Sequence, residues 1–313
     1  MVDKNRDKAR ALVLLSGGLD SRLAVKILQD QLGEENVEAL FFILPFGGGC
    51  CSDRHCVFKF CQKNNVKLHI NNCQEGQLFN EYMDLIKNPA HQRGSCLNPC
   101  IDCHLFMLKK AKKLLGDEGL DFIATGEVLG ERPLSQRKKP MQKIEREAGL
   151  EGQVLRPLSA KVLPKTEPEK NNLVNRGKLS GIKGRGRKKQ MELAKKYRID
   201  YPQPAGGCLL CEKGYVEKLK PILDKPGLKY KDIALLSVGR HFAASQIILG
   251  KNEDENKKLQ KEKGIKLIPK QPGPTALIRP WKKDAKKESL IERAKKLIQD
   301  YTKHNIKDIE NKE

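Results

Sequence analysis

The feature that most constrains the fold is a regular alternation of short apolar runs and amphipathic stretches that extends as far as Gly126. The apolar runs predict buried strands at residues 11–15, 37–44, 66–70 and 121–125. Stretches with helical spacing lie at residues 20–32, 53–65, 77–87 and 103–116. Consecutive parallel strands require a crossover, usually a helix, and such helices cover both faces of the sheet. We therefore expect an α/β fold with a parallel sheet covered by helices on both faces.

Beyond Gly126 the pattern becomes irregular and strongly basic. Residues 132–146 carry six basic side chains and one acidic side chain, and the run at 154–158 predicts a last sheet strand. Residues 176–198 contain ten basic residues and a single acidic one. The glycine-rich first half of this stretch predicts a loop, and Lys188–Tyr197 predicts a helix.

A second composition begins at about Gly214. Short apolar segments separated by Gly, Asn and Pro occur at residues 233–238, 245–249 and 266–268. A charged helix is predicted from about Lys286 to Tyr301. We therefore expect two domains, a catalytic domain at residues 1–213 and a small α+β module at residues 214–313.

The composition of the chain indicates which class of partner it binds and which cellular compartment it occupies. The chain has 61 Lys+Arg against 39 Asp+Glu, a net charge of +22, which indicates a polyanionic partner such as RNA. A charged surface of the kind found in hyperthermophiles explains many charges but not this imbalance. No apolar stretch reaches the roughly 20 residues of a membrane helix, and the N-terminus has no signal-peptide pattern, so we expect a cytoplasmic protein. The ten cysteines then predict reduced thiols used for metal, cluster or sulfur chemistry.

The sharpest motif is Ser16-Gly17-Gly18-Leu19-Asp20-Ser21, between the first strand and the first helix. Two glycines allow a tight bend in which successive N–H groups converge on an anion. The positive end of the helix dipole adds to the same point, and the two serines can donate hydrogen bonds. The motif therefore predicts a phosphate-binding loop. It lacks the Gly-Lys-Ser/Thr ending of a Walker A site.

This motif resembles the signature of the PP-loop ATPase family, the ATP pyrophosphatases. The resemblance implies that the loop holds the leaving pyrophosphate of ATP while a nucleophile attacks the α-phosphate. It also implies a sheet domain of the adenine nucleotide α-hydrolase-like kind. By this resemblance Asp20 helps to hold Mg²⁺, and the residues that bind ATP are Ser16, Gly17, Gly18, Asp20, Ser21 and Gly126.

Two Cys-x-x-Cys pairs, Cys100/Cys103 and Cys208/Cys211, can each address one metal centre or one redox couple. Three interpretations stay open. The two pairs form a four-cysteine zinc site; or Cys100 and Cys208 alternate as sulfur acceptor and resolving thiol in a persulfide mechanism; or a [4Fe–4S] cluster is held by Cys100, Cys103 and one cysteine of the second pair, with one iron open to sulfide. We favour the cluster, with Cys208 as the third ligand, Cys211 as the alternative to Cys208, and Cys96 as a neighbour.

The cysteine segment permits a narrower comparison. Asn98-Pro99-Cys100-x-x-Cys103, followed by Asp121–Gly126, resembles the tRNA uridine thiolases, which include the tRNA 2-thiouridylases and the 4-thiouridine synthetases. The resemblance implies ATP-dependent adenylation of a uracil carbonyl oxygen and its replacement by sulfur, with Asp20, Cys100 and Cys208 as the catalytic residues. Glu127 stands where a histidine is common in these enzymes, and the C-terminal module does not look like the barrel of the bacterial 2-thiouridylases.

The other cysteines and one histidine receive simpler interpretations. Cys56, Cys61 and Cys73 are expected to be core thiols, while Cys50 and Cys51 follow the second strand, where the adenine of ATP is expected to pass. For His104, which directly follows the first cysteine pair, we expect a surface role. A helix start at Cys100 is expected to lower the pKa of its thiol.

The two basic stretches are expected to contact RNA phosphates. Their candidate residues are Arg132, Arg137, Lys138, Lys139, Arg185, Arg187, Lys188 and Lys189. Arg240, His241 and Phe242, with Trp281 and Tyr230, give the C-terminal module either RNA contacts or a small core. Two other functions remain alternatives: a PP-loop amide or amine ligase, and a zinc-stabilised RNA-binding protein. The leading hypothesis is a tRNA uridine sulfurtransferase that uses ATP, Mg²⁺, a [4Fe–4S] cluster and a sulfide or persulfide donor.

Overall fold

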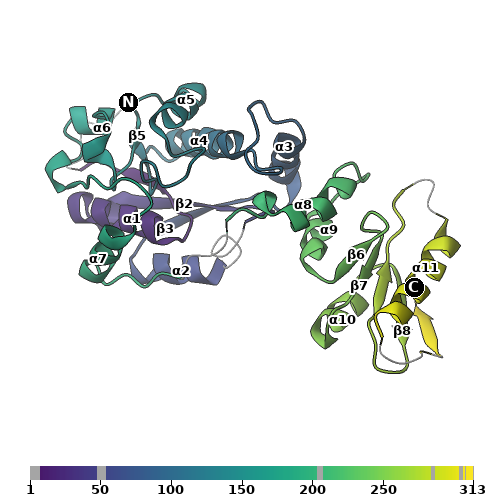
Figure 1. Ribbon diagram of the computed structural model, residues 1–313. Coiled ribbons are helices and arrows are strands. Elements are labelled where there is room, and N and C mark those ends of the chain that lie inside the picture. The colour runs from purple at the N-terminus through teal and green to yellow at the C-terminus, as the bar shows by residue number, and fades with distance from the viewer. Residues whose placement is uncertain are drawn as a thin grey trace. The chain divides into compact units, whose positions relative to one another are not determined.

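The computed structural model describes residues 8–47, 54–202, 207–282, 286–302, 306 and 308–312. The chain divides into two compact units, Met1–Cys211 and Glu212–Glu313, called here the N-terminal and C-terminal units (Figure 1). The expected adenine neighbours Cys50 and Cys51 lie outside the described residues. Among the described helices, none combines the length and the apolar character that crossing a membrane requires.

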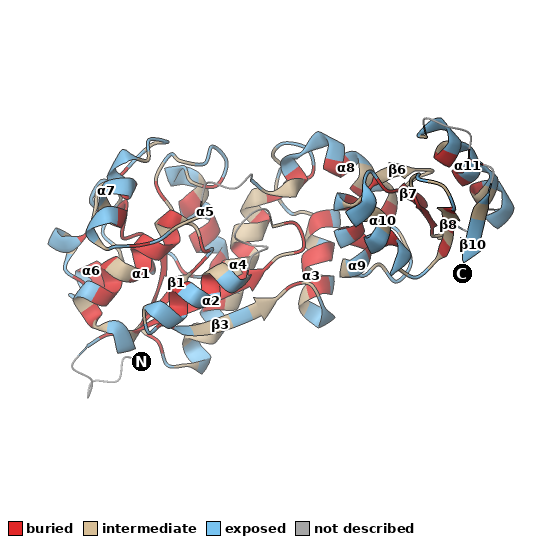
Figure 2. Cartoon of the chain, turned by 90° about the horizontal axis from the view of Figure 1, so that it is seen from below, coloured by how far each residue is buried: buried red, intermediate tan, exposed pale blue. Residues whose placement is uncertain are grey.

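A five-stranded parallel sheet forms the centre of the N-terminal unit, as expected. The strand order is β3-β2-β1-β4-β5. The strands are β1 (Ala11–Leu14), β2 (Val37–Ile43), β3 (Lys67–Asn72), β4 (Phe122–Thr125) and β5 (Val154–Leu155). The central strands β1, β2 and β4 are almost entirely buried, whereas the edge strand β3 is half-exposed (Figure 2).

Helices cover both faces of this sheet (Figure 1), which confirms the predicted fold class. One face carries α1 (Leu19–Leu32), α2 (Arg54–Lys63) and α7 (Lys188–Lys196). The other face carries α3 (Gly76–Lys87), α4 (Cys100–Asp117) and α5 (Lys138–Ala148). The short helix α6 (Glu167–Lys170) follows β5 and begins with a capping box at Thr166.

Helix α5 corrects the expectation that residues 132–146 are irregular. The numerous basic residues conceal an amphipathic pattern, because Met141, Ile144 and Ala148 recur at helical spacing and are buried. Gly149 ends the helix in the left-handed conformation that favours glycine.

Strand register determines which loops meet at the carboxyl edge of the sheet. Leu14, the last residue of β1, pairs with Leu40 of β2 on one side and with Thr125, the last residue of β4, on the other. The segments that follow β1 and β4 therefore leave the sheet side by side. They lie where the strand order reverses, which is where doubly wound sheets bind their ligands.

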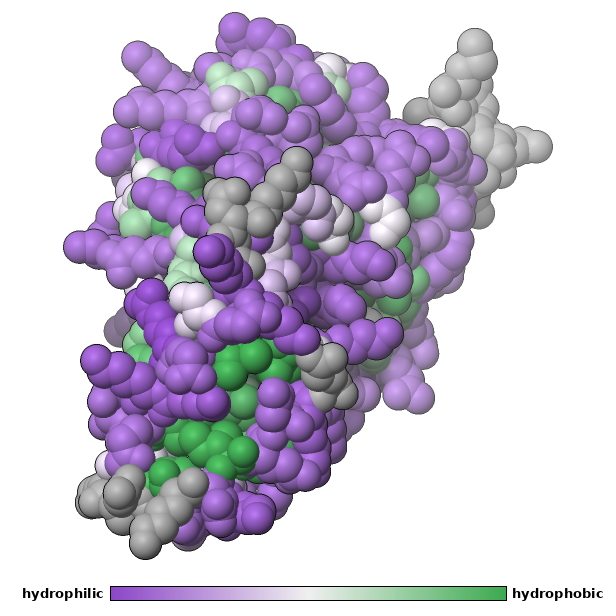
Figure 3. Space-filling view, turned by 90° about the vertical axis from the view of Figure 1, so that its right-hand side faces the viewer, coloured by the Kyte–Doolittle hydropathy of each residue, from purple (hydrophilic) through white to green (hydrophobic). Residues whose placement is uncertain are grey.

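The C-terminal unit contains a second five-stranded sheet, which is antiparallel and has the order β10-β8-β9-β7-β6. Its strands are β6 (Arg240–Phe242), β7 (Ile247–Leu249), β8 (Ile265–Pro269), β9 (Ala276–Ile278) and β10 (Ile309–Lys312), and its helices are α8 (Lys213–Leu219), α9 (Tyr230–Ala234), α10 (Glu253–Gln260) and α11 (Lys287–Asp300). Helix α11 packs on one face, and α10 with the turn at Leu235–Ser237 packs on the other. The apolar segment at 233–238 is thus mainly helical. In Figure 3, hydrophilic side chains dominate the visible face and surround a smaller hydrophobic group.

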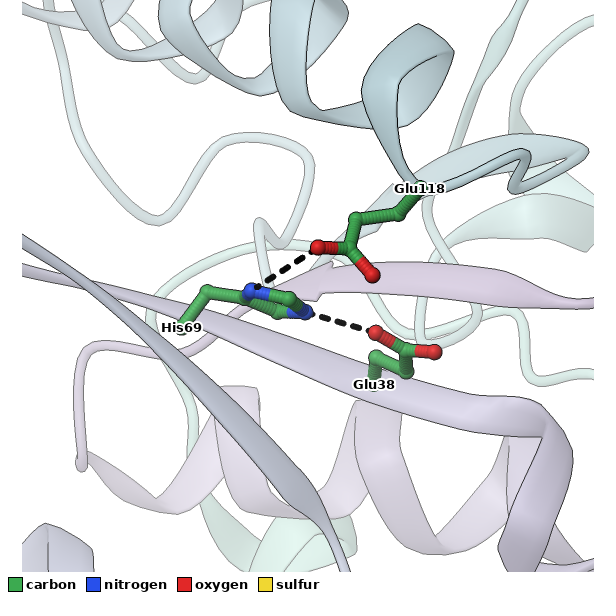
Figure 4. A group of neighbouring side chains, drawn as sticks. All are labelled: Glu38, His69 and Glu118. Atoms are coloured by element: carbon green, nitrogen blue, oxygen red, sulfur yellow. Dashed lines mark hydrogen bonds and ion pairs between the residues drawn. The ribbon is translucent and has the colours of Figure 1, made fainter.

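A buried carboxylate stabilises the N-terminal unit near the amino end of β2. Glu38, whose side chain is 3% exposed, contacts His69 at 2.6 Å, Lys67 at 3.3 Å and the guanidinium of Arg10. Figure 4 shows His69 between Glu38 and Glu118. Although these three side chains have the spacing of a metal site, two cations already neutralise the carboxylates, so we interpret the group as an ion-pair network.

We predict that Glu38→Gln destabilises the N-terminal unit by about 2 kcal/mol at neutral pH, because it leaves buried donors without their charged acceptor. Burial alone raises the pKa of Glu38, but hydrogen bonds from His69, Arg10 and Lys67 outweigh it and lower the pKa. The stabilisation is therefore present above the unfolded-state pKa and is lost as the pH falls through the folded-state pKa. Urea unfolding at neutral and acid pH measures both effects. Glu118→Gln, at a more exposed partner, should change stability much less than Glu38→Gln does; equal losses for the two variants would contradict the interpretation.

Candidate functional site

The loop between β1 and α1 has the geometry that the glycine-serine motif predicts. Gly17 adopts a φ of +83°, which few other residues tolerate. Ser16 Oγ lies 3.2 Å from Ser21 Oγ and accepts from the N–H of Gly18 at 3.4 Å, and Ser21 Oγ donates to the Gly18 carbonyl at 3.0 Å. Two hydroxyl groups therefore meet at the start of α1, where the helix dipole favours an anion.

Arg22 stabilises this loop from its buried side. This residue was not identified from the sequence. Its guanidinium is buried and donates to the carbonyl of Gly17 at 2.7 Å and to that of Asp200 at 2.6 Å. It also lies 2.7 Å from Cys56 Sγ and packs over the ring of Phe60. A charged residue on the buried face of α1 was the signal that could have revealed this role.

Gly126 brings the end of β4 against the start of α1. A Cβ atom at residue 126 would lie 2.5 Å from the backbone nitrogen of Ser21 and 2.6 Å from the carbonyl carbon of Asp20. Only glycine therefore permits this approach. The next residue, Glu127, turns toward helix α4, so a single segment touches both the phosphate loop and the cysteine helix.

Helix α4 begins at Cys100, and the distal cysteine segment lies against the residues before it. The N–H of Leu97 donates to the carbonyl of Leu210 at 3.1 Å, and Asn98 Nδ2 donates to Cys211 Sγ at 2.9 Å. Two cysteine pairs that are far apart in the chain are thus adjacent in the fold. Cys96 and Cys211 are exposed, whereas Cys100, Cys103 and Cys208 are half-buried.

Cys100 faces a histidine that carries its own carboxylate partner. His104 hydrogen-bonds the Cys100 thiol, and its Nδ1 lies 3.1 Å from Glu127 Oε1. Burial lowers the pKa of His104, but Cys100 and Glu127 outweigh that effect and raise it to about 10. Burial raises the pKa of Cys100, but His104 and a 3.3 Å hydrogen bond with Ser135 lower it overall. The expected surface role of His104 is therefore wrong: its ring links two site residues.

Glu127 is held ionised by a second buried cation. Arg156, which follows β5, donates from Nε to Glu127 Oε2 at 3.0 Å and from Nη1 to Glu145, and Thr125 Oγ1 donates to the same Glu127 oxygen at 3.1 Å. Burial raises the pKa of Glu127, but Arg156 and His104 lower it to about 2. Glu127, noted in the sequence only as a departure from a resemblance, is thus part of the site.

Cys103 and Cys208 complete a group of thiols beside Cys100. Cys103 Sγ lies 3.2 Å from the hydroxyl of the fully buried Tyr82. Burial, with charge repulsion from the thiolates of Cys208 and Cys100, raises the pKa of Cys103. Such repulsion is what a cationic metal centre relieves when it binds several thiolates.

A single zinc ion would require closer sulfur atoms. Zn–S bonds of about 2.3 Å in a tetrahedron place the ligand sulfurs about 4 Å apart. Among the described residues, no three cysteine sulfurs lie within 4.8 Å of one another. The described cysteine sulfurs are therefore too far apart to bind one zinc ion together as they stand.

The two basic stretches, residues 132–146 and 176–198, both come close to the phosphate loop. The N–H of Gly184 donates to the carbonyl of Leu129 at 2.7 Å, which joins the second basic loop to the segment after β4. Arg187 and Arg132 consequently lie within electrostatic range of Asp20. Arg187 is half-buried and its Nε has no hydrogen-bond partner among the described residues. The other basic candidates are exposed, namely Arg132, Arg137, Lys138, Lys139, Arg185, Lys188 and Lys189.

Asp20 stands between these arginines and a second carboxylate. Burial, followed by the charge of Glu131, raises the pKa of Asp20 to about 6, while Arg187 and Arg132 act in the opposite direction. Asp20 Oδ1 is buried without a hydrogen-bond partner among the described residues. An unsatisfied carboxylate oxygen beside a phosphate loop suits Mg²⁺, which prefers oxygen ligands.

Comparison with known families agrees with this geometry. Residues 9–148 match the family model described as the tRNA methyl transferase HUP domain. This segment is similar to the HUP domain that the model describes, and its parallel sheet is consistent with that match. The match covers β1 to α5 and thus includes both the phosphate loop and the first cysteine pair. A search of curated proteins found no match to the chain.

Solved structures with some likeness to the chain include two archaeal proteins. One is a predicted subunit of tRNA methyltransferase from Methanocaldococcus jannaschii, with 16% identity, a TM-score of 0.40, and coverage of 68% of this chain and 88% of that one. The other is the U34-tRNA thiolase NcsA from Methanococcus maripaludis with its [4Fe–4S] cluster, with 18% identity, a TM-score of 0.37, and coverage of 75% and 76%. Both likenesses are distant, so the HUP assignment rests on the family match and the sheet topology.

We predict that His104→Gln slows alkylation of Cys100 by iodoacetamide at neutral pH about tenfold in metal-free protein. The glutamine amide carries no positive charge, so the thiolate fraction of Cys100 falls. Peptide mass spectrometry reports each cysteine separately, and exposed Cys96 provides the internal control. An unchanged rate at Cys100 would show that His104 does not stabilise its thiolate.

Proposed function

We propose that this chain is an ATP-dependent tRNA uridine sulfurtransferase. The observation that carries the proposal is the segment Thr125–Glu127, in which Gly126 lies against the phosphate loop and Glu127 pairs with the histidine beside Cys100. An adenylating site and a thiolate site are therefore joined by adjacent residues. The net charge of +22 supports RNA as the substrate, and the name of the matched family supports tRNA.

The first step is adenylation of a uracil carbonyl. The uracil oxygen attacks the α-phosphorus of ATP, the bond from that phosphorus to the bridging oxygen breaks, and pyrophosphate leaves. Ser16, Ser21 and the N–H groups at the start of α1 stabilise the charge that develops on the leaving group. Asp20 would hold Mg²⁺, which would neutralise phosphate charge, and Arg187 with Arg132 adds positive charge at the same edge.

The second step replaces oxygen by sulfur. Sulfide adds to the activated carbon, the carbon–oxygen bond breaks, and AMP leaves with the former carbonyl oxygen. Cys100, Cys103 and Cys208 suit a [4Fe–4S] cluster, which with three protein ligands would supply an open iron able to hold sulfide. His104, whose own pKa is raised by Cys100 and Glu127, lowers the pKa of Cys100 and so favours the thiolate form that binding iron requires.

A cysteine persulfide mechanism is the second candidate, and a specific observation supports it. The pair formed by His104 and Cys100 resembles the activation of nucleophilic cysteines by a neighbouring imidazolium. In this version a persulfide on Cys100 delivers sulfur, Cys208 releases the product by forming a disulfide with Cys100, and an external thiol reduces that disulfide. The donor and the reductant then replace sulfide and the cluster.

The test combines tRNA analysis with iron analysis. We predict that anaerobically purified protein contains iron and acid-labile sulfide, and converts a tRNA uridine to thiouridine in the presence of ATP, Mg²⁺ and sulfide, as measured by nucleoside mass spectrometry. Cys100→Ala, Cys103→Ala and Cys208→Ala should each reduce thiolation at least a hundredfold. Cys96→Ser, an exposed neighbour, should retain it, and Cys211→Ala decides which distal cysteine is the third ligand.

Other results would redirect the assignment. Iron-free protein that is active with a persulfide donor would establish the persulfide mechanism. ATP–pyrophosphate exchange that needs none of the cysteines would indicate a PP-loop ligase. RNA binding without any exchange would indicate a binding protein with a degenerate loop.

Gly126 provides a separate test of the adenylation site. We predict that Gly126→Ala reduces tRNA-dependent ATP–pyrophosphate exchange at least tenfold, because its Cβ atom displaces the backbone at Asp20 and Ser21. Gly116→Ala is the matched control, since a Cβ atom there meets nothing within 4 Å. Circular dichroism checks that both variants fold. Normal exchange by Gly126→Ala would disprove the proposed position of the leaving pyrophosphate.

A further inference from the structure

Tyr82 is a buried residue of α3 to which the proposed reaction gives no role. It is 1% exposed. Its ring stacks on Phe46, with the ring centroids 6.5 Å apart, and meets Phe106 of α4 edge-on at 5.6 Å. Close packing against two other aromatic rings holds the side chain in one orientation. The position of its hydroxyl group is therefore set by the core of the N-terminal unit.

The hydroxyl group of Tyr82 contacts a sulfur atom. It lies 3.2 Å from Cys103 Sγ, with which it forms a hydrogen bond. A buried tyrosine hydroxyl normally finds an acceptor, and a phenol keeps its proton at neutral pH. A cysteine that binds a metal centre does so as a thiolate, which has no proton to donate. Tyr82 is therefore the donor whenever Cys103 acts as a ligand.

The ring of Tyr82 also contacts the support of the distal cysteine pair. The carbonyl of Phe46, on which the ring stacks, accepts from the N–H of Leu209 at 3.2 Å. Leu209 directly follows Cys208 in the chain. The thiols of Cys103 and Cys208 both lie within electrostatic range of the Tyr82 hydroxyl. One side chain thus contacts the first cysteine pair directly and the segment of the second pair through one neighbour.

The other sulfur of the first pair faces a second buried hydroxyl. Ser135 is fully buried, and its Oγ lies 3.3 Å from Cys100 Sγ. It comes from the loop before α5, which Gln136 holds closed. The carbonyl of Gln136 accepts from the N–H of Gly130 at 2.6 Å, and its Oε1 accepts from the N–H of Arg132 at 3.0 Å. Two separate elements of the fold therefore each supply one hydroxyl to one sulfur of the pair.

We propose that Tyr82 is a positioning residue that donates a hydrogen bond to the Cys103 sulfur and supports the segment of Cys208. Ser135 serves the Cys100 sulfur in the same way. A hydrogen bond to a ligand sulfur stabilises the extra negative charge of a reduced cluster, so each donor raises the reduction potential. This inference rests on the proposed function, because it assumes that these sulfurs hold a [4Fe–4S] cluster.

The reduction potential of the cluster tests the two hydroxyl groups. The full chain is reconstituted anaerobically with iron and sulfide and titrated with dithionite, and electron paramagnetic resonance follows the reduced cluster. Tyr82→Phe keeps the ring and removes the donor, so we expect a lower midpoint potential at an unchanged iron content. Ser135→Ala should lower the potential as well. Tyr197→Phe is the matched control, because this residue ends α7 on the opposite face of the sheet, and its potential should equal that of the parent chain.

A second variant tests the support of the distal segment by the ring. Tyr82→Leu removes the stacking on Phe46, so we expect iron release to a chelator to be at least fivefold faster than from the parent chain. Tyr82→Phe retains the stacking and should release iron at the parent rate. Circular dichroism checks the fold of each variant, and if Tyr82→Leu does not fold, the potentials of the other two variants still decide the role of the hydroxyl groups.

The outcomes separate this inference from the proposed function. Parent potentials in both Tyr82→Phe and Ser135→Ala, in chains that carry a full cluster, would overturn the inference and leave tRNA thiolation as it was. A parent chain that binds no iron would overturn the cluster and this inference with it, and its activity with a persulfide donor would then decide the proposed function separately.

Discussion

The close approach of β4 to the first turn of α1 is the constraint on which the site depends. It leaves no room for a side chain at Gly126, so the backbone beyond β4 passes directly over the phosphate loop. Glu127 consequently faces α4 rather than solvent. The parallel register of Leu14 with Thr125 makes this arrangement possible, because it brings both strand ends to the same level of the sheet. A change of register would separate the two halves of the site.

A row of alternating charges extends from this contact through the N-terminal unit. It consists of the Cys100 thiolate, the His104 imidazolium, the Glu127 carboxylate, the Arg156 guanidinium and the Glu145 carboxylate. Removing one member of a buried ion pair typically costs about 3–5 kcal/mol, since the partner stays behind as an uncompensated charge. The row therefore acts on the pKa of Cys100 through His104, which contacts the thiol and is itself paired with Glu127. The strands β4 and β5 hold those groups in place, so the chemistry of the thiol depends on the integrity of the sheet.

Much of the N-terminal unit could be predicted from the sequence because hydrophobic periodicity is a local property. The strands and helices up to β4 occur at the expected positions, and the motif Ser16–Ser21 forms the expected loop. The contact of Cys100 with His104 is also local, because the two residues lie one turn apart on α4. Only the tertiary fold shows that Glu127, which follows β4, meets His104. Buried charges do leave a signal, since Arg156 interrupts an apolar run and Arg22 lies on the buried face of α1, but that signal does not identify a partner.

The excess of basic residues has more than one physical meaning. Most of the basic candidates are exposed, where they can move with a phosphate backbone and exchange it rapidly. Arg187 differs, because it is half-buried near Asp20 and its Nε has no partner among the described residues. Desolvating a guanidinium without a full set of acceptors is unfavourable unless a ligand supplies them. The position of Arg187 therefore points to the phosphates of a bound nucleotide. In the composition Arg187 counts only as one more positive charge. Its burial distinguishes it from the exposed basic residues.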